Sequence, residues 1–317
     1  MKMIDVVIVN WNAGRQLYEC LNSIEHSNLS IIKNVIVIDN ASVDDSISLI
    51  NDIAWTFNLI VIQEMKNLGF GKACNKAARF SNANYILFLN PDTKVYQNSI
   101  KETLSFLSSD ENEEYGVCGI KLYDDTDRIQ KHCARFPSFK TYFGQSTGLN
   151  TLFPRIFPHV IMDDFDHQSS LDVDHCIGAF YMIRRHIFDA AGGFDERFFV
   201  YLEDLDLSFR VHELGFKIRY FSDVSAFHKG GGTSEKVKAH RLFYSLRSRI
   251  LYCFKHFSCY EACAVTLLAL FVEPIPRTVQ SLILKRSFSE FKNVFNGYLL
   301  LWQYVGSVIK AGVHREK

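Results

Sequence analysis

The stretch that decides the fold is Ile4-Asp5-Val6-Val7-Ile8-Val9-Asn10-Trp11-Asn12, a β-branched run that ends in polar residues. Such a run predicts a buried strand. A helical pattern follows at residues 15–27, and strand and helix patterns then alternate. The further strands are expected at residues 35–38, 59–62 and 85–89, and the helices at residues 44–54 and 71–80. This alternation predicts an α/β fold with a mostly parallel sheet covered by helices on both faces.

Polar residues stand at the ends of three of these expected strands: Asn10-Trp11-Asn12, Asp39-Asn40 and Asn90-Pro91-Asp92. In open α/β sheets, ligands bind beyond the carboxyl ends of the strands. An acidic side chain that ends a buried strand, as Asp39 does, needs hydrogen-bond donors. A nucleotide base or ribose would supply them, and a following helix start is the alternative. The pattern favours the nucleotide.

Residues 67–75 form a glycine-containing turn into a helix. Its backbone amides could meet phosphate or ribose oxygens. The turn has neither Gly-x-Gly-x-x-Gly nor Gly-Lys-Ser/Thr, so the sequence supports neither a dinucleotide fingerprint nor a P-loop.

A second acidic element lies in residues 192–210, Gly-Gly-Phe-Asp-Glu-Arg-Phe-Phe-Val-Tyr-Leu-Glu-Asp-Leu-Asp-Leu-Ser-Phe-Arg. Glu203, Asp204 and Asp206 are expected in a first helical turn, where the helix dipole favours anions. Ordinary helix-start acids are the alternative, but the apolar surroundings suit proton transfer. Together with Asp92, these acids suggest metal-assisted transfer chemistry. His228 ends a later strand before a glycine run and offers an imidazole to Mn²⁺, with a structural histidine as the alternative.

The composition, 48% hydrophobic and 22% charged residues, describes a globular protein. The zero net charge hides an asymmetry: residues 236–317 hold 13 Lys and Arg against 4 Asp and Glu. A basic and apolar tail on an acidic body suggests an anionic surface as partner rather than nucleic acid. Eight cysteines without Cys-x-x-Cys suggest reduced, mostly buried thiols in a cytosolic protein, with His175-Cys176 as core or wall. No secretory signal pattern is expected at the N-terminus.

The expected organisation has a catalytic domain at residues 1–234 and a basic, apolar helical region at residues 235–317. The domain divides into two halves, residues 1–120 and residues 121–234. Residues 123–170 read as loop, a lid or an acceptor-recognition insert. The apolar stretch 262–272 is too short to span a bilayer, because Glu273-Pro274 follow it. The stretch 294–309 is longer, but polar residues and a glycine interrupt it. We therefore expect both to form helices at a membrane surface or in the protein core. A membrane surface or a second copy of the chain would cover them.

The chain resembles the family 2 glycosyltransferases of the GT-A fold, and within them the rhamnosyltransferase-like branch of bacterial surface-polysaccharide synthesis. The matching segments span about residues 4–232 in the family's order. They are residues 6–12, 37–42, 67–71, 89–93, 178–185 and 192–206, and His228.

The resemblance implies that residues 1–120 form the nucleotide-sugar half of the catalytic domain and residues 121–234 the acceptor half. It also implies the roles of individual residues. Asp204 matches the general base, and Asp92 and His228 match the metal site. Gly178 and Glu203 fall on the acceptor side. The remaining residues would surround the nucleotide sugar together with Asp92: Val9, Asn10, Trp11, Asp39, Asn67, Gly69 and Asn90. One departure is that Asn90 replaces the first acid of the family's Asp-x-Asp, which leaves less negative charge for the metal.

The resemblance further implies inverting transfer of a sugar, favoured as L-rhamnose from dTDP-L-rhamnose, with Mn²⁺ or Mg²⁺ as cofactor. The acceptor would be a hydroxyl of a polyprenyl-diphosphate-linked or growing glycan, at the inner face of the cell membrane. The alternatives are a UDP-sugar donor and a non-catalytic assembly subunit of the same fold. A nucleotidyltransferase is disfavoured because no basic, glycine-rich phosphate loop lies near the N-terminus.

Overall fold

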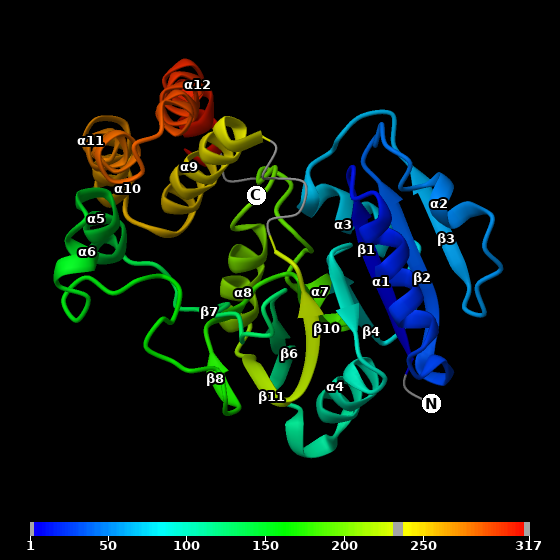
Figure 1. Ribbon diagram of the computed structural model, residues 1–317. Helices are drawn as coiled ribbons and strands as arrows, with labels where there is room; N and C mark the ends of the chain where they lie inside the picture. Colours follow the sequence, from blue (N-terminus) through cyan, green and yellow to red (C-terminus); the bar gives the residue numbers. More distant parts are fainter. Residues whose placement is uncertain (1–2, 231–236, 314–317) are drawn as a thin grey trace. The chain divides into compact units, whose positions relative to one another are not determined.

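The computed structural model describes residues 3–230 and 237–313, which form two compact units (Figure 1). The sheet unit comprises Met1–Arg135, Ile161–Glu196 and Glu203–Thr233. The helical unit comprises Phe136–Val160, Arg197–Leu202 and Ser234–Lys317. The expected boundary at residue 234 lies outside the described residues. Two segments expected in the catalytic domain, residues 136–160 and 197–202, belong to the helical unit.

The sheet unit is built on one large twisted sheet with the strand order β3-β2-β1-β4-β10-β6-β11-β5, and β8 pairs with β11. The pairs β1–β2, β2–β3, β1–β4 and β6–β11 are parallel, and β10 runs antiparallel between β4 and β6. The strands are β1 (Ile4–Asn10), β2 (Ile32–Asp39), β3 (Leu59–Gln63), β4 (Tyr85–Leu89), β5 (Thr93–Val95), β6 (Tyr115–Tyr123), β8 (Leu171–Val173), β10 (Phe180–Arg184) and β11 (Lys217–His228). A separate small sheet pairs β7 (Cys133–Ala134) with β9 (His175–Cys176).

Helices cover both faces of this sheet, as the sequence predicts. All seven residues of β1 are buried, and alternate ones face two different hydrophobic cores. One core holds the apolar sides of α1 (Arg15–Glu25) and α4 (Ser99–Ser108). The other holds residues of α3 (Phe70–Ala78), α7 (Arg185–Ala190) and α8 (Glu203–Glu213). The α/β class, the sheet and the two helical layers are confirmed.

Several expected elements differ in extent. The helix expected at residues 44–54 is only α2 (Ser48–Asn51), because Asp44 binds the loop instead: its carboxylate accepts from the Gly14 and Ser46 backbone N–H groups. Strand β11 is continuous over residues 217–228, with a register shift between Phe221 and Ser225. Strands β5 and β6 and helix α4 were not expected.

The stretch expected as loop, residues 123–170, contains regular structure. Besides β7, it holds α5 (Phe139–Thr147) and α6 (Leu149–Leu152) of the helical unit. Ser138 caps α5 reciprocally with Thr141, a pairing that lacks the glutamate or glutamine typical of this motif. The remaining short helical turns of the sheet unit are η1 (Leu29–Ile31) and η2 (Asp110–Asn112).

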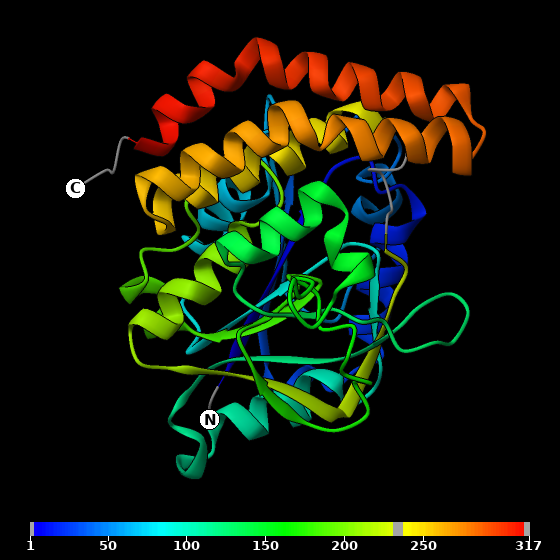
Figure 2. The same cartoon turned by 90° about the vertical axis from the view of Figure 1, so that its left-hand side faces the viewer.

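The helical unit is dominated by α9 (Lys238–His256), α12 (Phe288–Val313) and one continuous helix between them. Figure 2 shows α12 alongside that continuous helix. It joins α10 (Cys259–Leu267), η4 (Leu268–Val272), α11 (Pro274–Val279) and η5 (Gln280–Leu284). The expectation that it stops before Glu273-Pro274 is wrong. Wide helical turns flank Pro274, so the helix runs from Cys259 to Leu284, 26 residues that by length and composition alone could cross a membrane.

Inside the helical unit, Glu273 of this continuous helix is buried in an ion-pair network. Its carboxylate pairs with Arg249 of α9 at 2.5 Å and with Arg277 one turn later at 2.6 Å. Burial alone would raise the pKa of Glu273, but the two guanidinium groups lower it below its usual value. A buried acid of this kind needs its partners, so the network fixes the continuous helix against α9.

The segment Arg197–Leu202 also packs within the helical unit, directly before Glu203 in the chain. Arg247 and Ser248 of α9 donate to the carbonyls of Arg197 and Val200. Tyr201 and Leu202 both have positive φ, 69° and 65°, which is unusual for two consecutive residues other than glycine. Strained backbone of this kind persists where the surroundings hold it, and it often lies beside functional residues.

Candidate active site

The ends of β1 and β2 meet at one edge of the sheet, where Asn10 pairs with Asp39 in register. The Asn10 amide is fully buried and donates to Asp39 Oδ1 at 2.7 Å and to Ser46 Oγ at 2.8 Å. Asp39 Oδ2 accepts from the Ser42 backbone N–H at 3.0 Å. Asn10 and Asp39 therefore hold the turn of residues 40–46. The Asp39 carboxylate accepts from a backbone N–H that follows it, which is the contact expected under the alternative of a helix start.

The glycine turn before α3 is fixed to the same strand end. The Asn40 side chain donates to the Gly69 carbonyl at 3.1 Å and accepts from the Leu68 N–H at 3.3 Å. Asn67 Oδ1 accepts from the Gly69 N–H at 2.8 Å. The structure thus brings the Asn67–Gly69 turn to the end of β2, near the residues that the sequence assigns to the nucleotide.

Asp92 and His228 come together at the junction of β5 and β11. His228 pairs with Thr93 in the sheet, and its Nε2 lies 3.4 Å from Asp92 Oδ1. Gln130 orients the ring: its Oε1 accepts from His228 Nδ1 at 2.8 Å, and its amide donates to the His228 carbonyl at 2.6 Å. With the proton on Nδ1, the Nε2 lone pair faces the carboxylate. A histidine that ligates a metal shows this arrangement, so the pair fits a divalent cation.

The turn that carries Asn90 and Asp92 is held by the segment before β10. The Ala179 carbonyl accepts from the Asn90 N–H at 3.1 Å and from Thr93 Oγ1 at 3.2 Å. The neighbouring residue, Gly178, donates its N–H to Asp204 Oδ2 at 2.8 Å. Two consecutive residues therefore bind both acidic elements and fix them in one site.

Asp204 lies in the first turn of α8, as the sequence predicts. Besides the bond from Gly178, its Oδ1 accepts from the Leu205 N–H at 2.8 Å, and its side chain stays 20% exposed. A Cβ at Gly178 would lie 3.3 Å from Asp204 Oδ2, so glycine permits this close approach. His175 Nε2 lies 3.7 Å from the same oxygen.

The neighbouring Glu203 is more deeply buried than Asp204 and has fewer hydrogen-bond partners. It is 5% exposed, and its Oε2 has no hydrogen-bond partner among the described residues. Burial and the adjacent Asp204 raise the pKa of Glu203 well above its ordinary value, which favours the protonated acid. Its Cβ packs near Gly71 at the start of α3, because a Cβ at Gly71 would lie 3.5 Å away.

Two site residues escaped the sequence analysis. Gln130 lies in a stretch without periodicity, 98 positions before His228, and no local pattern marks it. His175 was interpreted as core or wall. It is buried, and burial lowers its pKa although Asp204 opposes this. Its Nδ1 also hydrogen-bonds Ser208 Oγ at 2.8 Å, so a neutral imidazole joins α8 to β9 beside the Asp204 carboxylate.

Solved structures that share this fold include glycosyltransferases. One is the mannosyltransferase PcManGT from Pyrobaculum calidifontis in complex with GDP-Man and Mn²⁺ (TM-score 0.54, 14% identity, 98% of this chain and 85% of that one). Another is S. aureus TarS 1-349 in complex with UDP-GlcNAc (TM-score 0.53, 17% identity, 99% and 89%). At such identities the likeness shows the fold, and it confirms the GT-A class expected from the sequence.

The chain belongs to glycosyl transferase family 2, whose model matches residues 5–192. Its relatives include the rhamnosyltransferase WbbL of Escherichia coli (29% identity over 50% of this chain and 59% of the relative). They also include the N-acetylglucosaminyl-diphospho-decaprenol L-rhamnosyltransferase of Mycobacterium tuberculosis (24% over 75% and 80%). The match thus spans about three fifths of the E. coli relative. The resemblance to the rhamnosyltransferase-like members of this family is confirmed.

Proposed function

We propose that this enzyme moves a sugar from a nucleoside-diphosphate donor to an acceptor hydroxyl with inversion at the anomeric carbon. The observation that carries the proposal is the pair Gly178-Ala179, which holds the Asp204 carboxylate and the Asn90–Asp92 turn together. The base and the residues suited to the diphosphate therefore share one site.

In this proposal, Asp204 accepts the proton of the acceptor hydroxyl as that oxygen attacks the anomeric carbon. The bond between this carbon and the diphosphate oxygen breaks, and its electrons leave with the nucleoside diphosphate. Glu203 keeps its own proton, because its pKa is raised, so Asp204 is the acid available as base. Holding both substrates in the site supplies much of the remaining rate.

The donor would lie along the ends of β1 and β2, at Val9, Asn10, Trp11, Asp39, Asn67, Gly69, Asn90 and Asp92. Asp92 and His228 would hold Mn²⁺ or Mg²⁺, which supplies neutralisation of charge on the leaving diphosphate. The presence of Mn²⁺ in the PcManGT complex supports a divalent metal. Asn90 lowers the charge of the site, so we expect weaker metal binding than an acid at that position would give.

We favour dTDP-L-rhamnose as donor and a polyprenyl-diphosphate-linked glycan as acceptor. Support comes from the names of the relatives, three of which are rhamnosyltransferases, one of them acting on N-acetylglucosaminyl-diphospho-decaprenol. A UDP-sugar is the alternative, because TarS is solved with UDP-GlcNAc. The donor choice and the acceptor are tested together below.

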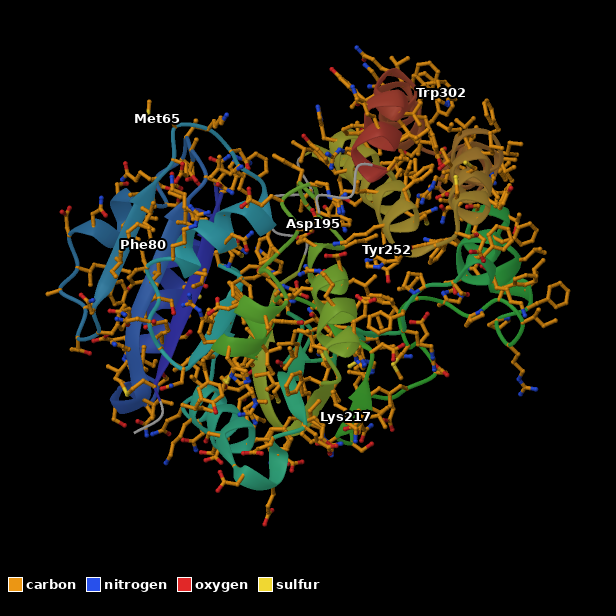
Figure 3. The ribbon with its side chains drawn as sticks, turned by 180° about the vertical axis from the view of Figure 1, so that it is seen from behind. Met65, Phe80, Asp195, Lys217, Tyr252 and Trp302 are labelled. Carbon is orange, nitrogen blue, oxygen red and sulfur yellow. The ribbon has the colours of Figure 1, made fainter. Side chains whose placement is uncertain are left out.

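We further propose that the helical unit attaches the enzyme peripherally to the inner face of the cell membrane. Leu267, Phe271 and Ile275 recur every four residues on the continuous helix and are 56%, 65% and 63% exposed. Figure 3 shows side chains projecting from α12, including the labelled Trp302. Exposed Lys285 and Arg286 directly follow the continuous helix in the chain. An apolar stripe with basic residues suits an anionic bilayer surface.

A position at the membrane surface fits this helix better than a transmembrane position. Glu273, near the middle of the continuous helix, is buried against Arg249 of α9, so this helix is part of a folded protein unit. A second copy of the chain on the same apolar stripe remains the alternative occupant.

A panel of nucleotide sugars tests the function. Purified enzyme is heated with dTDP-L-rhamnose, UDP-GlcNAc or GDP-mannose, each with and without Mn²⁺. A donor that binds only the folded state raises the melting temperature. We expect the largest shift with dTDP-L-rhamnose and Mn²⁺, and release of dTDP once a polyprenyl-diphosphate-linked acceptor is added. Binding of a donor without release under any acceptor would instead support the non-catalytic subunit.

A further inference from the structure

A compact group of metal-binding side chains lies outside the proposed donor site, on the small sheet of the sheet unit. Cys133 of β7 and Cys176 of β9 are directly paired across this sheet, with their sulfur atoms 4.0 Å apart. His132 precedes Cys133. One ligand atom from each of the three residues lies within 4.8 Å of the other two, and all three residues are buried. The cysteines are 43 positions apart, so no sequence spacing reveals them.

The His132 ring has one nitrogen committed and one unused. Nε2 hydrogen-bonds the Ile120 carbonyl at 3.0 Å, which places the proton on Nε2 and the lone pair on Nδ1. Nδ1 is buried without a hydrogen-bond partner among the described residues, and the residue is only 3% exposed. Leaving a buried polar atom unpaired costs free energy. With Nε2 donating to the Ile120 carbonyl, the ring offers the Nδ1 lone pair to a ligand.

The backbone around the cysteines is held in place. His167 Nε2 accepts from the His132 N–H at 3.2 Å and from the Cys133 N–H at 3.1 Å, and its Nδ1 hydrogen-bonds the Phe165 carbonyl at 2.9 Å. On the other side, a Cβ at Gly119 would lie 2.8 Å from the Cys176 sulfur, so only glycine leaves room for this thiol.

We propose that His132 Nδ1 and the Cys133 and Cys176 thiolates bind a thiophilic divalent cation, Zn²⁺ in the first place. Two thiolates and an imidazole are the ligands that zinc prefers, and binding releases the two thiol protons to solvent. The Ile120 carbonyl then acts as the outer partner that ligating histidines commonly have. A disulfide between Cys133 and Cys176 would leave His132 Nδ1 unpaired, whereas the metal satisfies it.

This site would stabilise the segment that contains Gly178, whose N–H donates to the proposed base Asp204. Cys176 lies two residues before Gly178, the residue that donates to Asp204. The ion would tie β7 to β9 and hold this segment. Its soft ligands differ from the oxygen and imidazole ligands of Asp92 and His228, so the two metal sites are separable by ligand chemistry.

The test measures metal in the full chain, purified under reducing conditions with zinc and then exchanged into metal-free buffer. We expect one bound zinc per chain, measured by inductively coupled plasma mass spectrometry. Replacing the zinc with Co²⁺ should produce thiolate-to-cobalt charge-transfer absorption in the wild type. Loss of a residue that hydrogen-bonds a metal ligand typically weakens metal binding by about 10- to 100-fold. Cys133→Ser and Cys176→Ser remove a ligand itself, so we expect each to weaken metal binding by more than this. Cys253→Ser, a buried thiol of the helical unit, and Asp92→Ala should keep the zinc and the cobalt band.

The wild-type cobalt spectrum keeps the test decisive even if a cysteine variant does not fold. Wild-type protein without retained zinc and without the thiolate band would overturn the proposal. So would zinc that is lost in Asp92→Ala but kept in the cysteine variants. A wild-type mass lower by two hydrogens, restored by a reductant, would show a disulfide in place of the metal.

Discussion

The sheet unit fixes the Asp204 carboxylate and the His228 imidazole through hydrogen bonds with neighbouring residues, whereas the helical unit buries the Glu273–Arg249 ion pair and leaves large apolar side chains exposed. Asp204 and the Asn90–Asp92 turn are both held by Gly178-Ala179. In the helical unit, Glu273 and Arg249 are hidden, while Phe271 and Ile275 face outward. Fixed polar groups suit chemistry, and exposed apolar groups with nearby cations suit attachment. We therefore expect the sheet unit to carry catalysis and the helical unit to carry membrane attachment.

The largest effect is expected when the proposed base, Asp204, is removed and the rest of the site is left unchanged. Asp204→Asn keeps the shape and the Gly178 bond but removes the proton acceptor. We expect a loss of about 10²–10⁴ in transfer rate with donor binding nearly intact, measured by release of nucleoside diphosphate and by calorimetry. Asp189→Asn, an exposed acid of the same unit that pairs with Arg185, is the control and should keep activity. Near-normal turnover of Asp204→Asn would remove Asp204 from the mechanism.

The next largest effect is expected at the Asp92–His228 pair. Asp92→Ala and His228→Ala should weaken donor binding in the presence of Mn²⁺, and Asp92 should matter more because its side chain carries charge. Gln130→Leu leaves both residues but removes the partner of His228 Nδ1, and we expect about 10- to 100-fold weaker metal binding. Titration of Mn²⁺ followed by donor binding measures all three. Activity that survives saturating EDTA would contradict a metal role, and Asn90 would then be the reason.

Replacing one glycine by alanine in each unit compares how closely the two glycines are packed. Gly119→Ala forces a Cβ to 2.6 Å from Cys176 Cβ, and we expect a loss of about 1–3 kcal/mol in the free energy of unfolding. Gly306→Ala on α12 meets nothing within 4 Å and should stabilise by about 0.4–1 kcal/mol. Chemical denaturation measures both. Equal effects of the two substitutions would show that the close contact at Gly119 is absent.

Glu203 gives a pH test of the buried acid. Because its pKa is raised in the folded chain, the unfolded chain loses this proton first, so stability falls as pH rises above the ordinary pKa of 4.5. The slope is at most about 1.4 kcal/mol per pH unit for one proton. Glu203→Gln removes this dependence and should melt higher than wild type at neutral pH, with the difference shrinking toward acid pH. A pH-independent difference would mean that Glu203 is ionised in the folded protein.

The smallest effects per residue are expected in the helical unit. Arg286→Ala should weaken binding to anionic vesicles by about 1 kcal/mol, roughly five-fold, since each cation near the leaflet contributes about that much. High salt should reduce binding further, and phosphatidylcholine vesicles should bind weakly. Vesicle flotation measures these effects, with Asp189→Asn as a surface-charge control in the sheet unit. Failure on both vesicle types would contradict the membrane proposal and leave the helical unit as an oligomer contact or a core element.

The strand-end residues were predictable because each signal is local. The run Ile4–Asn10 shows its buried strand and its polar end within seven residues, and Asp204 follows an aromatic run at the start of a helix. Contacts between distant positions were not predictable. Gln130 reaches His228 across 98 positions, and Cys133 meets Cys176 only through the pairing of β7 and β9. The length of the helix through Pro274 also escaped, because proline usually ends a helix and here wide turns accommodate it.

The most direct test of the central claim follows the anomeric carbon during one reaction. Wild-type enzyme, dTDP-L-rhamnose, Mn²⁺ and a polyprenyl-diphosphate-linked acceptor are observed by NMR together with an Asp204→Asn reaction. We expect acceptor-dependent release of dTDP and a glycosidic product whose anomeric configuration is opposite to that of the donor, with the variant slowed by about 10²–10⁴. A product that retains the configuration, or donor hydrolysis at the same rate without acceptor, would contradict direct displacement with Asp204 as base.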